Sequence, residues 1–448
     1  PTDWLTVLKI GLGLARGVAA GRLLPHGFHR AGYAIGVGFH DRTGRGDHHA
    51  FVPDHGFFSG DDSTVPAGSG RADSFPYSMN FRLASLLSLA LLGAVLLAGC
   101  ATQHRRALDP VHARQVEETY LRRPYTFSPE LEEKILALDA QHVSERDVRG
   151  VLAHAPAPRI IKIRGGVDIR GGVYSVYKRM WSFSEFLMGM GYPGLSLTNP
   201  GDGTYAYSCY ETGEAMAGSI AWFYEREGLR PMIVGHSQGG IQTVKILHKL
   251  AGHSHKPIPL WNPLTWKAEP RYEFKDPWTG QMQAVTNLVI PYATAVGAGG
   301  ITRVMPNQWE VIDRLRSIPD SVEEFTGFCK TLDLLGGDYL GYGPANLYRP
   351  YRPNGRAYVR NVWLPASYSH GSMPESKHLA KSQAIMDWLN RYQPSPATES
   401  EPRLEEHLEG DTTHILWAAE VWYGIKKHWV LELQRVIRAH REQTHAPR

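Results

Sequence analysis

The sequence predicts a mixed α/β fold in which a mostly parallel sheet is flanked by helices. In the middle of the chain, short apolar runs alternate with longer segments whose apolar residues recur at helical spacing. The runs cover 159–164, 192–198, 232–234 and 285–292, and the helical segments cover 181–190, 211–227 and 239–250. Such alternation is typical of parallel sheets, because each crossover helix returns the chain to the same edge.

The composition is that of an ordinary globular protein. The chain has 448 residues, of which 42% are hydrophobic and 21% charged. Its formal net charge is only +4 and it has no long basic block, which disfavours a nucleic-acid partner. Its three cysteines form no CxxC pair, which argues against a zinc ribbon or a thioredoxin-type redox site.

Residues 79–99 have the layout of a secretory signal peptide. Arg82 supplies a positive start, and the apolar run 83–97 is shorter than the ~20 residues that cross a bilayer comfortably. Its ending, Leu-Ala-Gly followed by Cys100, resembles a bacterial lipobox. The resemblance implies cleavage before Cys100, a lipid on that cysteine, and attachment at the bacterial cell envelope. The alternative is a buried apolar helix that ends in cysteine.

Two segments flank this signal. Residues 1–78 are rich in Gly, His, Asp and Arg and show no sustained apolar period. We expect translation to begin at Met79, which makes 1–78 upstream sequence or a disordered extension; the alternative is a genuine extension with an internal anchor. Residues 100–127 are mostly polar and are predicted to tether the folded domain to the membrane.

The folded domain is expected over 128–395, beginning with two short helices. A Pro- and Trp-rich stretch, 257–281, interrupts the alternation and is interpreted as a lid or as an ordinary surface loop. A polar, acidic linker is expected at 396–411. Residues 412–448 are predicted as a C-terminal amphipathic helix, which either packs on its own domain or rests on a membrane surface.

One motif carries chemistry. Residues 235–239 read Gly-His-Ser-Gln-Gly, with an apolar strand before them and a helix directly after. A serine on such a strand-to-helix turn projects its hydroxyl from the sheet edge, and the positions two before and two after it must be small. The start of the helix adds N–H dipoles that face a developing negative charge. Ser237 is therefore the predicted nucleophile.

The run IVGHSQGG at 233–240 resembles the nucleophile elbow of α/β-hydrolases, especially those of the lipase and esterase type. The resemblance covers about residues 156–390. It implies an α/β-hydrolase-like fold and a catalytic triad in the chain order serine, acid, histidine. No cofactor is expected.

The resemblance places the catalytic base in a loop between a late strand and the last helix of the domain. His370 fits this position best, because it follows the apolar run 358–365, has small neighbours and precedes a helix over 375–389. A plain surface histidine is the alternative. No metal site is predicted from the cluster that contains His248, His253 and His255, which has no nearby carboxylate.

The family places the triad acid after the strand that precedes the histidine strand. That strand is expected at 325–332, which makes Asp333 the next residue. Asp338, in a Gly-Gly-Asp sequence, is the rival, and Asp333 is slightly favoured. Cys209 and Cys329 are left after Cys100, and they form either a disulfide or two free thiols.

The oxyanion hole of the family uses two backbone N–H groups, of which one follows the nucleophile, here at Gln238. The other comes from a loop after an earlier strand. Gly165 and Gly166 lie in such a loop and allow the backbone to approach the substrate oxygen closely. This loop differs from the family's His-Gly-Gly-Gly form, so the donor within it stays open, and a flexible turn without a role is the alternative.

Together these features predict a serine hydrolase that cleaves carboxylic esters, with a small ester or a lipid as substrate, and that is anchored at the cell envelope through Cys100. An acyltransferase, a thioesterase or an amidase could use the same triad. A binding lipoprotein on an inactive hydrolase scaffold is the alternative from a different class. The sequence leaves the oligomeric state open.

Overall fold

The computed structural model describes residues 107–121, 127–166, 176–254, 256–299, 306–330, 333, 336 and 350–445. The segments predicted as the extension, 1–78, and as the signal peptide, 79–99, lie outside the described residues. So do Cys100, residues 101–106 and 122–126 of the predicted tether, and Asp338.

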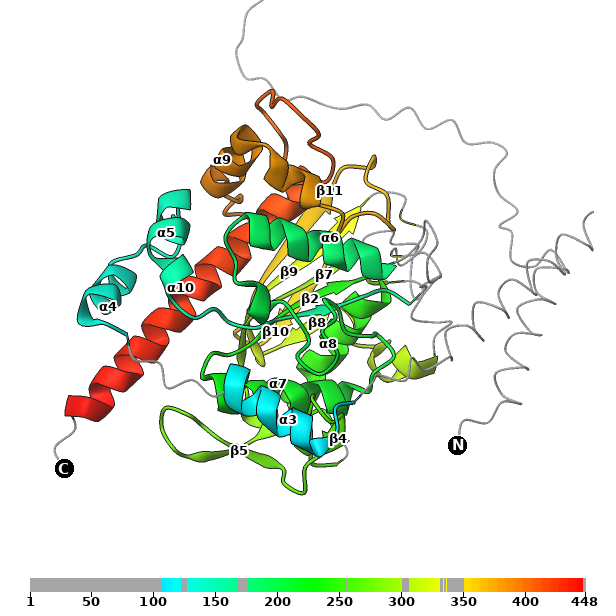
Figure 1. Ribbon diagram of the computed structural model, residues 1–448. Coiled ribbons are helices and arrows are strands. Elements are labelled where there is room, and N and C mark those ends of the chain that lie inside the picture. Colours follow the sequence, from blue (N-terminus) through cyan, green and yellow to red (C-terminus); the bar gives the residue numbers. More distant parts are fainter. Residues whose placement is uncertain are drawn as a thin grey trace, which may run out of the picture. The chain divides into compact units, whose positions relative to one another are not determined.

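A six-stranded sheet forms the centre of the molecule (Figure 1). Its strands lie side by side in chain order, and every neighbouring pair is parallel. They are β1 (Ile160–Ile163), β2 (Met232–His236), β7 (Ile290–Val296), β9 (Val322–Lys330), β11 (Tyr358–Leu364) and β12 (Glu399–Ser400). The predicted mixed α/β fold with a mainly parallel sheet is therefore confirmed, and the carboxyl ends of the strands meet at one edge.

Strands β1, β2 and β7 are buried along their whole length on both faces of the sheet, which explains why their sequences are mostly apolar. Along β1, Ile160 belongs to one apolar cluster and Ile161 to the other. Met232 and Ile233 of β2 divide between the two clusters in the same way. This division follows from strand geometry, because successive side chains point to opposite faces.

Two helices, α7 (Gly213–Glu227) and α8 (Gln238–Leu250), pack on one face. Thr212 caps the start of α7 by accepting a hydrogen bond from the N–H of Ala215, and Gly228 ends it with a left-handed φ of 71°. Helix α8 begins one residue after Ser237 and has buried residues throughout its length.

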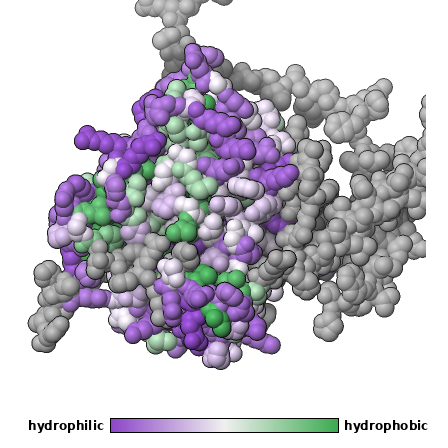
Figure 2. Space-filling model, viewed as in Figure 1, coloured by the Kyte–Doolittle hydropathy of each residue, from purple (hydrophilic) through white to green (hydrophobic). Residues whose placement is uncertain are grey.

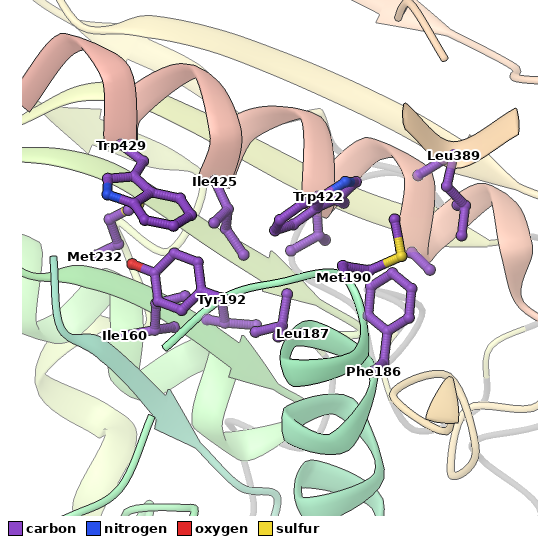
Figure 3. Close-up of a cluster of buried hydrophobic side chains, with 14 of the residues drawn as sticks. Ile160, Phe186, Leu187, Met190, Tyr192, Met232, Leu389, Trp422, Ile425 and Trp429 are labelled. Atoms are coloured by element: carbon purple, nitrogen blue, oxygen red, sulfur yellow. The ribbon is translucent and has the colours of Figure 1, made fainter. Parts of the chain in front are cut away.

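The other face is covered by α6 (Val176–Gly189), α9 (Gln383–Arg391) and α10 (Ile415–His445). Figure 3 shows Trp422, Ile425 and Trp429 of α10 directed toward the layer that contains Leu187 and Tyr192. The rings of Trp429 and Tyr192 meet edge to face, with their centroids 4.7 Å apart. Helix α10 is thus part of the central packing of the domain.

Helix α10 also differs from a simple amphipathic extension. Gly424 lies so close to β7 that a Cβ there would be 2.4 Å from the ring of Tyr292. Lys426, which the helical pattern places on a basic outer face, is buried and donates hydrogen bonds to the carbonyl oxygens of Val143 and Asn390. The stretch 396–411, expected as a linker, contributes β12 to the edge of the sheet.

Short elements surround this core. Two helices, α4 (Pro129–Leu136) and α5 (Glu145–Gly150), begin at Ser128 and Ser144, whose side chains cap them. A separate parallel pair is formed by β8 (Ser317–Pro319) and β10 (Arg352–Asn354). Part of the predicted tether is also folded: α3 (Pro110–Val116) is capped by Asp109, and the following turn is held by an ion pair between Glu117 and Arg226.

The strand predicted over 192–198 is wrong. Gly194–Ser196 form a single 3₁₀ turn, because Pro193 lacks the N–H that a central strand needs and the side chain of Tyr192 is tied to the carbonyl oxygen of Pro158. Tyr207 lies beside the edge strand β1 instead, where it pairs with Ile163 in an isolated parallel bridge.

The stretch 257–281, considered as a lid, lies along α7. It contains the hairpin of β3 (Trp261–Asn262) and β4 (Lys267–Ala268) and, with the residues after it, the hairpin of β5 (Glu273–Lys275) and β6 (Met282–Ala284). Trp278 donates a hydrogen bond to the carbonyl oxygen of Gly228, which lies before the amino end of β2. Ser237 follows the other end of that strand. The described contacts therefore attach the segment to α7 and place its second hairpin away from the nucleophile.

Cys209 and Cys329 are not bonded to each other, which excludes the disulfide considered between them. Burial raises the pKa of Cys209 to about 12. Among the described residues, no helix has the length and apolar character required to cross a membrane. On the face shown in Figure 2, apolar residues form small patches among polar ones.

Candidate active site

The backbone turns sharply at the predicted nucleophile. Strand β2 ends at His236, Ser237 adopts φ 55° and ψ −124°, and α8 begins at Gln238. A positive φ is unfavourable for a residue with a side chain and costs on the order of 1–3 kcal/mol. Such strain persists where the surrounding structure enforces it, and here it places Ser237 at the carboxyl edge of the sheet.

Glycines enforce the turn by allowing close backbone contacts. A Cβ on Gly235 would lie 2.2 Å from Oγ1 of Thr243, and one on Gly239 would lie 2.1 Å from the carbonyl oxygen of Ile163. Neither position has room for a side chain. The spacing of two residues on each side of Ser237 is the one that the sequence motif predicts.

His370 lies in the loop after β11, at the same edge of the sheet. Its Nε2 is 2.9 Å from Oγ of Ser237, although the two residues are 133 positions apart in the chain. The side chain is 13% exposed, so the hydrogen bond is shielded from most of the solvent but remains reachable. The histidine chosen from sequence is thus the one that lies next to the serine.

Asp333 completes a chain of hydrogen bonds. Nδ1 of His370 is 2.9 Å from both carboxylate oxygens of Asp333, which is almost fully buried. The backbone N–H of Gly336 donates a further hydrogen bond of 2.9 Å to this carboxylate. Since a carboxylate only accepts, Nδ1 of His370 carries the proton and Nε2 is free to accept from the serine hydroxyl. Asp338, the rival acid, lies outside the described residues.

The predicted oxyanion loop lies against the start of α8. The carbonyl oxygen of Gly166 accepts a 2.8 Å hydrogen bond from the hydroxyl of Tyr210, and a Cβ on Gly166 would be 1.9 Å from Oε1 of Gln238. Gln238 is the first residue of α8, and N–H groups in the first turn of a helix have no acceptor within that helix. Gly165 precedes this contact as part of the same loop.

Several residues around the triad were not predicted from sequence. Gly297, with φ 63°, lies so close to the base that a Cβ would be 2.9 Å from the ring of His370. Arg179 of α6 donates to the carbonyl oxygen of Gly371. The glycine after β7 was a visible signal, because it follows a strand directly, whereas nothing local marks Arg179.

His248 lies apart from this site. Its ring is hydrogen-bonded to His253, with 2.8 Å between the two Nδ1 atoms, and its Nε2 is 2.9 Å from the carbonyl oxygen of Ser317. Burial lowers the pKa of His248 to about 4, so it is neutral near pH 7. His255 lies outside the described residues. Within the part of the chain that the structure describes, no group of three or more His, Cys, Asp or Glu side chains is placed to hold a metal ion.

Comparison with known proteins gives no relative from which a role could be transferred. No protein-family model, no curated protein sequence and no solved structure matches the chain. The geometry of Ser237, His370 and Asp333 is therefore the basis on which a function can be proposed.

Proposed function

We propose that the protein is a serine hydrolase of the α/β-hydrolase type that cleaves carboxylic esters. The observation that carries the proposal is the position of His370, whose two ring nitrogens lie 2.9 Å from Ser237 and 2.9 Å from Asp333. Support also comes from the chain order serine, acid, histidine and from the strained turn at the nucleophile. Such a constellation is identified by geometry and roles, and this geometry fits nucleophilic acyl transfer.

The reaction begins when Oγ of Ser237 attacks the ester carbonyl carbon and its proton passes to Nε2 of His370. The carbonyl electron pair moves onto oxygen and returns as the bond to the alcohol breaks. The alcohol leaves with the proton from His370, and an acyl-serine remains. Water then attacks the carbonyl carbon of the acyl-serine and gives a proton to His370. The bond to Oγ breaks, Oγ takes the proton back from His370, and the carboxylic acid is released. Asp333 holds the ring orientation and stabilises its charged form, as the acid of a triad does.

The developing oxyanion needs donors that are already in place. The N–H of Gln238 is one candidate, because it lies next to the nucleophile at the start of α8. The loop with Gly165 and Gly166 is the candidate source of the second. The hydroxyl of Tyr210 fixes the carbonyl of Gly166, which restricts the orientation of the neighbouring peptide group.

The place of action follows from the signal-like segment. We propose that the protein is exported and held at the bacterial cell envelope by a lipid on Cys100, so that an ester or lipid at the membrane is its substrate. Replacing Cys100 by Ser should abolish incorporation of labelled palmitate and release the protein from the membrane fraction. Equal labelling of both proteins would contradict the anchor, and intact mass would show where the mature chain begins.

The enzymatic proposal is tested with p-nitrophenyl esters of short to long acyl chains. Ser237→Ala should lower hydrolysis by at least about 10³-fold, whereas Ser395→Ala, at an exposed serine, should leave it unchanged. The preferred chain length would separate an esterase from a lipase.

A fluorophosphonate probe separates the remaining functions. Labelling of Ser237 without ester hydrolysis would favour a thioesterase, an amidase or an acyltransferase. A folded protein that neither labels nor hydrolyses would contradict the proposal and support a binding role.

A further inference from the structure

The loop that carries the base is held by side chains from several other segments of the chain. Its residues 365–376 form no helix or strand. Two consecutive carbonyl oxygens of this loop nevertheless accept hydrogen bonds from outside it: that of His370 from Nε2 of His236, at 2.7 Å, and that of Gly371 from the guanidinium of Arg179. Arg179 also pairs with Glu375, farther along the same loop.

His236 is the residue immediately before the nucleophile. Its side chain is buried, at 1% exposure of the residue, and its ring lies beside that of His370, with centroids 5.3 Å apart. A carbonyl oxygen can only accept a hydrogen bond, so Nε2 of His236 must carry a proton. Its Nδ1 is buried and has no hydrogen-bond partner among the described residues.

The protonation state of His236 is fixed by its surroundings. Burial, and then the proximity of His370, lower the pKa of His236 to about 3. His236 is therefore neutral at the pH of the reaction, with its single proton on Nε2. It donates one hydrogen bond and takes no proton from Ser237, which distinguishes it from the base.

We propose that His236 is a positioning residue: its Nε2–H holds the backbone of His370 in register with the nucleophile turn, so that the base stays between Ser237 and Asp333. The inference rests on the proposed function of the same site. It assigns a role to the variable residue of the Gly-x-Ser-x-Gly motif, which the triad itself does not use.

The chemical reason is the link between the two reacting groups. His236 and Ser237 are adjacent in the chain, so the hydrogen bond from His236 ties the base to the backbone of the nucleophile. Without it, the remaining described contacts hold other residues of the loop: Arg179 bonds the carbonyl oxygen of Gly371, Ser182 accepts from the N–H of Ser376, and His414 contacts Ser372 and Glu375. Among the described contacts, the backbone of His370 itself would then have no bond to the strand of the nucleophile. Misplacement of a reacting group by 1 Å can reduce a rate by about 10²-fold.

A role in packing alone makes a different prediction. A buried aromatic ring that only fills space can be replaced by phenylalanine with little effect on the chemical step. A ring that donates a hydrogen bond cannot be replaced by phenylalanine without losing that bond. Glutamine can restore the bond, because its amide nitrogen reaches about as far as Nε2 of histidine. Asparagine is polar as well but shorter, so it provides a control for reach.

The test compares His236→Phe, His236→Gln and His236→Asn in the full chain, with kcat and KM measured separately on the best p-nitrophenyl ester and folding checked by thermal denaturation. We expect kcat to fall by about 10–100-fold in the phenylalanine and asparagine variants. The glutamine variant should stay within about threefold of the wild type, and KM should change little in all three. The rate of labelling of Ser237 by a fluorophosphonate should follow kcat.

The outcomes separate this inference from the proposed function. An inactive and unlabelled wild type contradicts the proposed function. With an active wild type, a phenylalanine variant that keeps kcat within twofold overturns the role of His236, as does an equal loss in the glutamine and phenylalanine variants. If the phenylalanine variant does not fold, the contrast between glutamine and asparagine decides in the same way.

Discussion

The two ends of the sheet both contain a buried carboxylate next to a basic group, but the basic groups differ. At the carboxyl end, Asp333 is paired with His370. Toward the amino end, Glu432 of α10 is fully buried and paired with Arg230 and Arg435. Burial alone would raise the pKa of Glu432, but these two guanidinium groups lower it to about 2.

The difference shows how a similar pairing can serve structure or chemistry. Arginine keeps its proton under all ordinary conditions, so the ion pair of Glu432 with Arg230 joins α10 to the segment before β2 without exchanging protons, and Arg435 pairs with Glu432 within α10. Histidine can gain and lose a proton near neutral pH, so its pairing with a carboxylate can support proton transfer. The carboxyl end also contains the strained backbone at Ser237 and the close glycine contacts around it.

The largest expected effect is on kcat, which should depend on the carboxylate of Asp333 and not on that of Glu432. Asp333→Asn should reduce kcat by about 10⁴-fold, because the amide favours the wrong ring tautomer of the base. Glu432→Gln should leave kcat of the folded protein within about twofold. Both variants are measured on the same ester after the folded fraction has been determined. A comparable loss of kcat in both would break the distinction between the two ends.

The free energy of unfolding should fall more in Glu432→Gln than in Asp333→Asn, which is the reverse of the order expected for kcat. Glu432→Gln removes the buried carboxylate that Arg230 and Arg435 share and leaves Arg230 only the more exposed Glu323, which should cost about 3–5 kcal/mol in the free energy of unfolding. Urea denaturation measures this loss. A loss below about 1 kcal/mol would show that α10 is held mainly by its apolar contacts.

Acid should weaken the ion pairs of α10 in a defined range. The pKa of Glu432 is about 2 in the folded protein and near 4.5 in the unfolded chain, so its contribution is complete above pH 4.5 and is lost as the pH falls toward 2. The stability difference between the wild type and Glu432→Gln should therefore shrink by about 1.4 kcal/mol per pH unit across this range. A difference that stays constant down to pH 2.5 would contradict the pairing.

The glycine contacts of the nucleophile turn should be sensitive to a single methyl group. Gly239→Ala places a Cβ against the carbonyl oxygen of Ile163 and should cost about 1–3 kcal/mol of stability, with a fall in kcat because the loop of Gly165 must move. Gly150→Ala is the matched control, since a Cβ there has nothing within 4 Å. Equal behaviour of the two variants would remove the argument for enforced strain.

The smallest effect is expected at the surface. Lys134 and Glu130 form an exposed ion pair one helical turn apart in α4. Lys134→Gln should shift neither the urea midpoint nor kcat measurably, because solvent screens so exposed a pair. A loss of stability as large as that of Glu432→Gln would show that the exposed pair of Lys134 contributes as much as the buried pairs of Glu432, contrary to this expectation.

The local parts of the site could be predicted from sequence because they depend on neighbours in the chain. The turn at Ser237 follows from an apolar strand, two glycines and a helix start within a few residues. His370 and Asp333 could be selected because the resemblance to α/β-hydrolases implies which strands the base and the acid follow, and the structure brings all three side chains together.

Other features depend on contacts between distant segments, which a periodic pattern does not reveal. Helical spacing showed that α10 has an apolar face, but the burial of Lys426 on the opposite side requires the carbonyl oxygens of Val143 and Asn390. The role proposed for His236 likewise depends on a loop 134 positions away. The absent strand at 192–198 shows that an apolar run with proline and glycine is a weak signal for a strand.

Peptide mapping by mass spectrometry after reaction with a fluorophosphonate tests most directly whether Ser237 is a nucleophile activated by His370. We expect a single adduct on the peptide that contains Ser237, formed much more slowly in His370→Ala and not at all in Ser237→Ala. An adduct on another residue, or labelling that is independent of His370, would contradict the assignment of Ser237 as a nucleophile activated by that histidine.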